Sequence, residues 1–364
     1  MQLLDSVQLS DISESLQVSL QDIIHNVEIQ SEYCIKHPNY KPLELPESSI
    51  SRFQKLSPDL QNKYLSQQLR TFLYGIYYNG SLQSVLASDA DISNLAVNQN
   101  LENNTFLGVD LAFYDRLHEN NRGTGYWNYG WQVVRKEIDG SVAVHRDGLT
   151  LYVEPEALQT PAEVNHFTAI KLPKNLVQSG FYMAVANAGA SRHHQTDNQT
   201  LVRVYFNVTP DGAVAVMDGL TTQLNALSLE FTFKALYNPA DYRRYDSAVL
   251  YFDKNHYEQI QPILKTIYTE HQAYFQEQVP LFTKPIAPGL AIAEEPKHRF
   301  MENQSFGTHR CQIVANGLLA AWQEGNHTPT GKMTSILQEF SALNIKLQSP
   351  YLNADSEDIY MPLR

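Results

Sequence analysis

The spacing of apolar residues changes along this chain, and the change limits the folds open to it. Before about residue 120 the apolar residues recur at helical spacing, most clearly in a segment with Ser57 as N-cap and Pro58 at the first helical position. From Trp131 the period is two, and Asp-Gly pairs at 139–140 and 147–148 separate three short runs, which is typical of a β-meander. A helical first part therefore precedes a sheet-forming second part.

The same reasoning places the remaining elements. A further helix is expected near 7–27, and the stretch 37–49, with its three prolines, is interpreted as an extended linker or surface loop. The Thr-Pro-Asp-Gly sequence at 209–212 is interpreted as a turn between two strands. Strands are expected at 166–171, 180–186, 201–208, 212–217, 230–237 and 247–252, and helices at 218–227, 254–276 and 306–322.

Tight turns between successive strands favour antiparallel pairing, so the predicted class is α+β. We expect an antiparallel-rich mixed sheet flanked by helices, with a helical N-terminal region. The predicted division is a helical region, 1–120, followed by an α+β domain, 121–364, that carries the candidate site.

Composition excludes several classes of function. The 39 acidic residues exceed the 27 basic ones, giving a formal net charge of −12, which argues against nucleic acid as a partner. No apolar run is long enough to span a bilayer, and the N-terminus does not read as a signal peptide. The only cysteines, Cys34 and Cys311, fit a reducing compartment. A soluble, cytoplasmic protein without membrane partners is expected.

No sequence motif for a metal or cofactor is present: there is no P-loop, HExxH, CxxC or GxSxG. The pair His193-His194 is interpreted as part of a polar loop, because no third ligand follows at metal spacing. Cys311 lies on an apolar helical face with Val314 and Leu318 and is interpreted as a core residue. We therefore expect no cofactor and no metal.

Basic residues beside aromatic ones are the remaining candidates for chemistry. Arg203 lies in a strand with Tyr205 and Asn207 on its own face, and a solvent-facing arginine is an equal alternative. Lys234 lies in a second strand. Tyr242 and Arg244 precede a third strand, where an arginine can bind an oxyanion or form a structural pair with Asp246.

The fourth group lies further along the chain. Lys284 is in a loop braced by Pro285. Ser305 is the expected N-cap of a helix whose first turn holds His309 and Arg310. Basic residues oppose the dipole at a helix N-terminus, so an anion bound there, or an acidic neighbour such as Glu302, would offset them.

Five segments carry a resemblance to a known family: FLYGIYYNG, VRVYFN, YRRYDSAVLYF, PLFTKPIAPGLAIAEEP and SFGTHRCQIVANGL. Over about residues 33–322 the chain resembles the HopA-type family, named for a type III secretion effector of plant pathogens. Homologues in bacterial gene clusters for lanthipeptide-like natural products act as lyase components. The resemblance implies an α+β fold and elimination of phosphate from phosphoserine or phosphothreonine in a precursor peptide, after a kinase-like partner has made the phosphate.

The basic residues suit that reaction. Elimination needs a base for the Cα proton and a site for the leaving phosphate, but no metal. We assign Lys234 or Lys284 as the base and His309 as the acid. The phosphate would be held by three arginines, Arg203, Arg244 and Arg310. Tyr242 would donate a further hydrogen bond to it. At least three of these seven residues are predicted to line one pocket.

Two other functions stay open. A non-catalytic effector or adaptor that binds a phosphopeptide or a partner protein would need the same arginines but would tolerate loss of the lysines. A hydrolase that uses Asp246 with His309 ranks last, because no nucleophile or metal motif supports it.

Overall fold

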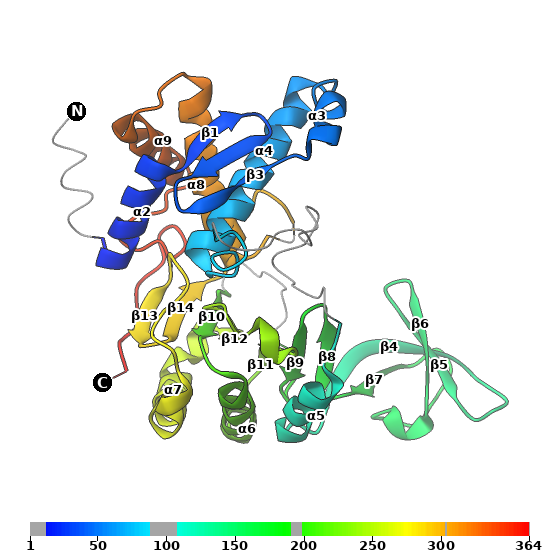
Figure 1. The fold of residues 1–364 in the computed structure, drawn as a ribbon. Coiled ribbons are helices and arrows are strands. Elements are labelled where there is room, and N and C mark those ends of the chain that lie inside the picture. Colours follow the sequence, from blue (N-terminus) through cyan, green and yellow to red (C-terminus); the bar gives the residue numbers. More distant parts are fainter. Residues whose placement is uncertain (1–11, 88–107, 191–198, 303, 364) are drawn as a thin grey trace.

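The computed structural model describes residues 12–87, 108–190, 199–302 and 304–363. Its centre is a seven-stranded sheet with helices on both faces, and a smaller sheet projects from one end of it (Figure 1). All strand pairs in the described residues are antiparallel. The prediction of an α+β fold with an antiparallel-rich sheet and a helical N-terminal region is confirmed.

The N-terminal region contains helices and a small sheet. The elements are α2 (Glu14–Asn26), β1 (Glu28–Ser31), β2 (Cys34–His37), β3 (Tyr40–Glu44), α3 (Glu47–Phe53), α4 (Pro58–Leu73) and a π-helix, η1 (Tyr74–Tyr78). Ser57 is the N-cap of α4 and Pro58 its first residue, as predicted. The helix expected near 7–27 is confirmed over 14–26, and its residues 7–11 lie outside the described residues.

The linker interpretation of 37–49 is wrong. This stretch contains β3 and the start of α3, and β3 pairs with β2 in a three-stranded sheet. Pro42 is compatible with a strand here because β3 is at the edge of that sheet, where an outward-facing backbone N–H is not needed.

The seven-stranded sheet has the order β13-β14-β10-β12-β11-β9-β8. Its strands are β13 (Lys284–Ala287), β14 (Leu290–Glu294), β10 (Leu201–Phe206), β12 (Ala248–Asp253), β11 (Phe231–Leu236), β9 (Phe181–Val185) and β8 (Asn175–Gln178). Alternate residues of β10 enter different cores: Val204 and Phe206 lie in one, and Tyr205 lies in the other. The first core includes α6 (Pro210–Ala226) and α7 (Tyr257–His271); the second includes η1 and α8 (Phe306–Gln323).

The strand predicted at 212–217, and the turn before it, are wrong. Thr209 is the N-cap of α6, its side chain accepting a hydrogen bond from the backbone N–H of Gly212, and Pro210 is the first helical residue. This is the same pattern of a cap followed by proline that begins α4. The apolar residues from Ala213 onward follow a helical period rather than a period of two.

The meander predicted from Trp131 is confirmed and forms a projecting arm (Figure 1). The arm is a four-stranded sheet of order β6-β5-β4-β7, and its own small core includes Trp131 and Ile170. Its strands are β4 (Tyr126–Lys136), β5 (Val142–Arg146), β6 (Leu149–Val153) and β7 (Phe167–Leu172). The helix α5 (Leu111–Asn120) precedes the arm and packs against α6.

The N-terminal helices share a core with the end of the chain. Apolar residues of α2 and α4 pack in one cluster with those of α8 and of α9 (Pro329–Ala342). Cys311 is buried in this cluster, as predicted. The division at residue 120 stays a prediction. Among the described residues, no helix has both the length and the apolarity that crossing a membrane requires.

Gly317 allows α8 and α9 to approach closely. A Cβ atom at this position would lie 2.6 Å from the Cα atom of Ile336 and 2.7 Å from its backbone nitrogen. Because those atoms belong to the backbone of α9, Gly317→Ala is expected to displace that helix and to lower the free energy of unfolding by about 1–3 kcal/mol. Urea denaturation measures the change. Gln323→Ala, at the exposed end of α8, is the matched control; equal midpoints for the two variants would contradict this packing.

Candidate functional site

Three basic side chains lie in a row on the sheet face that is turned toward η1 and α8. The guanidinium carbon of Arg203 is 5.0 Å from the ring centroid of Tyr251, and Nζ of Lys234 is 5.6 Å from the same ring. Lys234 Nζ is also 4.3 Å from the ring centroid of Phe181, and the guanidinium carbon of Arg244 is 6.0 Å from it. Two aromatic rings thus connect three cations, which we call the cationic row.

Strand register explains the row. Arg203 on β10 pairs with Tyr251 on β12, and Lys234 on β11 pairs with Val249 two residues earlier on the same strand. Paired residues of antiparallel strands point to the same face, so these side chains share one side of the sheet. The expectation that Arg203 shares a face with Tyr205 is confirmed by the same register.

Buried carboxylates fix both arginines of the row. The guanidinium of Arg203 forms an ion pair with Glu295, which also accepts a hydrogen bond of 2.7 Å from Arg299 Nη2. Arg244 donates to both carboxylate oxygens of Asp246, at 2.5 Å from Nε and 2.8 Å from Nη2. Each guanidinium is therefore held in one orientation.

Asp246 also connects the row to η1 and the loop after it. The hydroxyl of Tyr74 and the side-chain amide of Asn79 each donate to its carboxylate at 3.3 Å. Burial by itself would raise the pKa of Asp246, but the charge and hydrogen bonds of Arg244, the charge of Lys234 and the hydrogen bond from Asn79 outweigh burial and hold that pKa below its ordinary value. Asp246 is therefore ionised near neutral pH, and the structural pair that the sequence left open is present.

Two donors of the row have unused capacity. Nη1 of Arg244 is buried and makes no hydrogen bond within the part of the chain that the structure describes. Among those same residues, the ammonium of Lys234 has no hydrogen-bond partner; it lies over the rings of Phe181 and Tyr251, and its charge acts on the carboxylate of Asp246. A buried donor without an acceptor is costly, so a bound acceptor at this position would be stabilising.

Tyr242 lies on the other side of the sheet. Its hydroxyl donates to the carbonyl of Leu236 at 2.7 Å, and its ring packs edge-on against Phe113, with the centroids 5.7 Å apart. It belongs to the core under α6 and α7 and does not join the cationic row.

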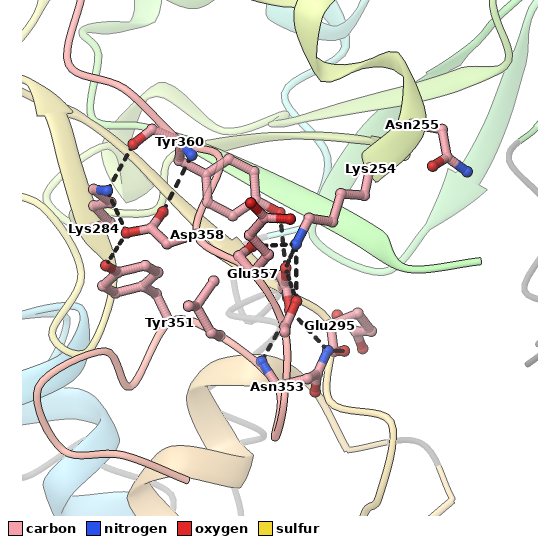
Figure 2. Close-up of polar contacts among 12 residues, drawn as sticks. Lys254, Asn255, Lys284, Glu295, Tyr351, Asn353, Glu357, Asp358 and Tyr360 are labelled. Atoms are coloured by element: carbon pink, nitrogen blue, oxygen red, sulfur yellow. Dashed lines mark hydrogen bonds and ion pairs between the residues drawn. The ribbon is translucent and has the colours of Figure 1, made fainter. Parts of the chain in front are cut away.

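Lys284 lies at the edge of the sheet, on β13, with three strands between it and Lys234. Its ammonium donates to Asp358 Oδ2 and to the carbonyl of Tyr360, both at 2.6 Å, and the Tyr351 hydroxyl donates to the same Asp358 oxygen (Figure 2). These contacts anchor the C-terminal segment, and they keep Lys284 away from the row.

His309 and Arg310 lie at the start of α8, where Ser305 is the N-cap, as predicted. Arg310 is fully buried and donates to the carbonyls of Pro350 and Leu352 at 2.7 and 2.9 Å, and to Nδ1 of His309 at 2.7 Å. The C-terminal segment therefore accepts two of the hydrogen bonds of Arg310. Burial, assisted by the charge of Arg310, lowers the pKa of His309 to about 3, so its imidazole is neutral near pH 7.

Sequence reasoning missed the adjacent acids at the end of β14. Glu295 holds Arg203 of the row, whereas Glu294 is fully buried and accepts hydrogen bonds from Lys254, Ser356 and Tyr360 at 2.8, 2.7 and 3.1 Å. Lys254 also donates to the carbonyl of Glu357 (Figure 2). The signal was present: two acids directly after an apolar strand are buried only when they are paired.

The arrangement suits an oxyanion. It offers two oriented guanidinium groups and an ammonium beside aromatic walls, and Arg and Lys are the usual ligands of phosphate. Within the described residues there is no cluster of three or more His, Cys, Asp or Glu that could hold a metal ion. His193 and His194 lie outside the described residues.

Comparisons with known proteins found a match to one family model and similarity to solved structures. The model of the HopA1 effector protein family matches residues 172–352, which include every residue of the cationic row. An effector protein of Pseudomonas syringae pv. tomato strain DC3000 is similar in structure, with 15% identity and a TM-score of 0.43 over 85% of this chain and 98% of that one. An effector protein of P. syringae pv. syringae strain 61 is 11% identical, with a TM-score of 0.39 over 67% of this chain and 81% of that one. Among curated proteins, none matches the sequence.

The pKa of His309 makes stability depend on pH. In the unfolded chain a histidine binds its proton near pH 6.5, but in the folded chain His309 binds it only near pH 3. The unfolded state therefore holds more protons between these values, and His309 lowers the free energy of unfolding as pH falls, by up to about 1.4 kcal/mol per pH unit. His309→Gln is expected to flatten this slope in urea denaturation between about pH 7.5 and pH 5.

His327→Gln, at an exposed position in the loop before α9, is the control for the histidine-to-glutamine substitution itself. Parallel slopes for His309→Gln and the unmodified protein would mean that His309 is not held neutral.

Proposed function

We propose, from the premise that this chain belongs through residues 172–352 to the HopA1 effector protein family, that it eliminates phosphate from phosphoserine or phosphothreonine of a precursor peptide. The observation that carries the proposal is the cationic row, where Lys234, without a hydrogen-bonding partner among the described residues, lies between two fixed arginines. A kinase-like partner would supply the phosphorylated peptide.

The reaction makes separate demands on the row. The amine of Lys234, in its neutral form, removes the proton from Cα. The electrons of the broken Cα–H bond form the Cα=Cβ double bond. The Cβ–O bond breaks and phosphate leaves with the bonding electrons, which gives a dehydroamino acid. Arg244 stabilises the leaving phosphate through the unused Nη1, with Arg203 on the other side of Lys234.

Four of the residues assigned from sequence have no part in this proposal. The donors of Tyr242, Lys284 and Arg310 are used in hydrogen bonds to backbone carbonyls or to Asp358. His309 is neutral near pH 7 and lacks a proton to give as an imidazolium. Phosphate leaves as an anion that guanidinium groups stabilise, so this elimination needs no separate acid.

A phosphopeptide-binding protein without catalysis is the second candidate. Both arginines of the row already form ion pairs with buried carboxylates, an arrangement that orients them for recognition whether or not a base is present. The two functions differ in what Lys234 does: it is essential for elimination and dispensable for binding.

Mass spectrometry of a phosphothreonine peptide incubated with the protein and a chelator tests the proposal. We expect loss of the elements of phosphoric acid. Lys234→Met should reduce the rate by a factor of about 100 or more, because a general base typically contributes this much. Methionine suits the site because it can pack against the rings of Phe181 and Tyr251. Lys265→Met, on the exposed side of α7, is the control and should react at the normal rate.

The other outcomes are distinct. Loss of phosphate with retention of the hydroxyl group would mean hydrolysis and would reject elimination. A peptide that binds equally to the unmodified protein and to Lys234→Met, and stays intact with the kinase-like partner present, would establish the binding protein instead.

A further inference from the structure

The strand β6 leaves one edge of the arm open. It is the outermost strand in the order β6-β5-β4-β7, and within the described ranges it pairs with β5 alone. Its sequence, Leu-Thr-Leu-Tyr-Val, contains no charge and no proline, the features by which natural sheets protect an edge from further pairing. Leu149 and Tyr152 are 54% and 60% exposed, and the arm stands away from the helical body (Figure 1).

The turn before β6 determines which of its backbone groups face outward. Asp147 and Gly148 both have positive φ angles, 50° and 80°, as in a two-residue type I′ turn. In such a hairpin the flanking pair, Arg146 and Leu149, is hydrogen-bonded, and the pairs then alternate. The N–H and C=O groups of Thr150 and Tyr152 therefore point away from β5, where they can accept another strand.

We infer that β6 binds an extended segment of the substrate peptide by strand addition. The segment would place apolar side chains beside Leu149, Leu151 and Val153, whose side chains lie on the same face of the arm as its core. Glu154 and Glu156 follow β6 and are exposed, so the segment would carry basic residues at that end. The inference rests on the proposed function for the identity of the substrate as a peptide.

The position of the arm favours the substrate as the occupant. Leu172 ends β7 and Asn175 begins β8, so two residues join the arm to the sheet that carries the cationic row. Next to β8 lie β9, with Phe181, and β11, with Lys234. In the arm, β4 and β5 separate β7 from β6, so a peptide with its phosphorylated residue at the row would pass β8 and β7 and cross the arm to reach β6.

A second copy of the chain is a poorer occupant. Five residues of edge are too few to bury the roughly 1,200 Å² that a stable dimer needs.

The probe is a fluorescent peptide of sequence Lys-Val-Thr-Val-Thr-Val-Lys, made alone and with a phosphothreonine segment joined to it by a flexible linker. Fluorescence anisotropy is expected to show binding of the unphosphorylated probe to the unmodified protein. Hydrogen exchange at the amides of Thr150 and Tyr152 should slow on binding. Lys234→Met should bind this probe normally, because Lys234 is not part of the arm.

Thr150→Pro separates strand addition from other modes of binding. It removes an outward N–H while leaving the hydrogen bonds between β5 and β6 intact. Affinity for the probe should fall by about tenfold or more, and Thr150→Val, which keeps the N–H, should bind normally. If Thr150→Pro disrupts the arm, the double variant Glu154→Lys and Glu156→Lys takes its place: it should weaken binding of this probe and favour one with Glu at both ends.

Each result supports or overturns the inference. Equal binding by Thr150→Pro and Thr150→Val without protection of the amides, or self-association through β6 without peptide binding, would overturn it. For the phosphorylated probe, Thr150→Pro should raise KM by about tenfold and leave kcat unchanged. If no variant eliminates phosphate but binding at β6 persists, the proposed reaction fails while the docking site stands.

Discussion

Burial of the seven-stranded sheet on both faces is the constraint on which the rest of this structure depends. One face of β10 packs Val204 and Phe206 under α6 and α7, and the other packs Tyr205 against Tyr78 and Phe306. A polar side chain on either face therefore loses contact with water on folding, and leaving it without a partner is costly. The positions of the charged residues of the sheet are consequently constrained by the partners that they need.

Compensation of charge follows from this burial. On one face, Glu295 holds Arg203 and Asp246 holds Arg244. On the other face, Glu294 accepts a hydrogen bond from Ser356 of the C-terminal segment. Breaking a buried pair costs more than forming it contributes, so these carboxylates secure geometry more than stability. The result is a pair of guanidinium groups with fixed orientation and, between them, a lysine that contacts aromatic rings. Such a site suits an anionic ligand whose position must be controlled.

The site and the arm have complementary functions in our proposals. The cationic row would recognise the phosphate, which is common to many phosphopeptides, whereas β6 would recognise the backbone and side chains of a separate segment. Two weak contacts on one flexible peptide raise affinity through effective concentration, without requiring either contact to be strong. The same division would allow one chemical step to serve peptides that differ near the phosphorylated residue.

Local sequence determined much of this fold. The cap and proline at Ser57 and Pro58, the Asp-Gly turns of the arm and the alternation around Arg203 were readable because each signal involves neighbours in sequence. Thr209 and Pro210 repeat the pattern of a helix cap followed by proline. The strand predicted after them is wrong because this pattern was interpreted as a turn and not as the start of a helix. The linker interpretation of 37–49 was wrong because the pairing of β3 with β2 outweighed the effect of its prolines.

Only the tertiary structure decided which basic residues share a site. Arg203, Lys234 and Arg244 lie on separate segments, and strand order brings them to the rings of Phe181 and Tyr251. The same strand order leaves Lys284 at the far edge, while the C-terminal segment takes up the donors of Arg310. The sequence alone determined the residue types and the face of each strand, because alternation is local. Their assembly depended on the order of strands, which contacts between distant segments decide.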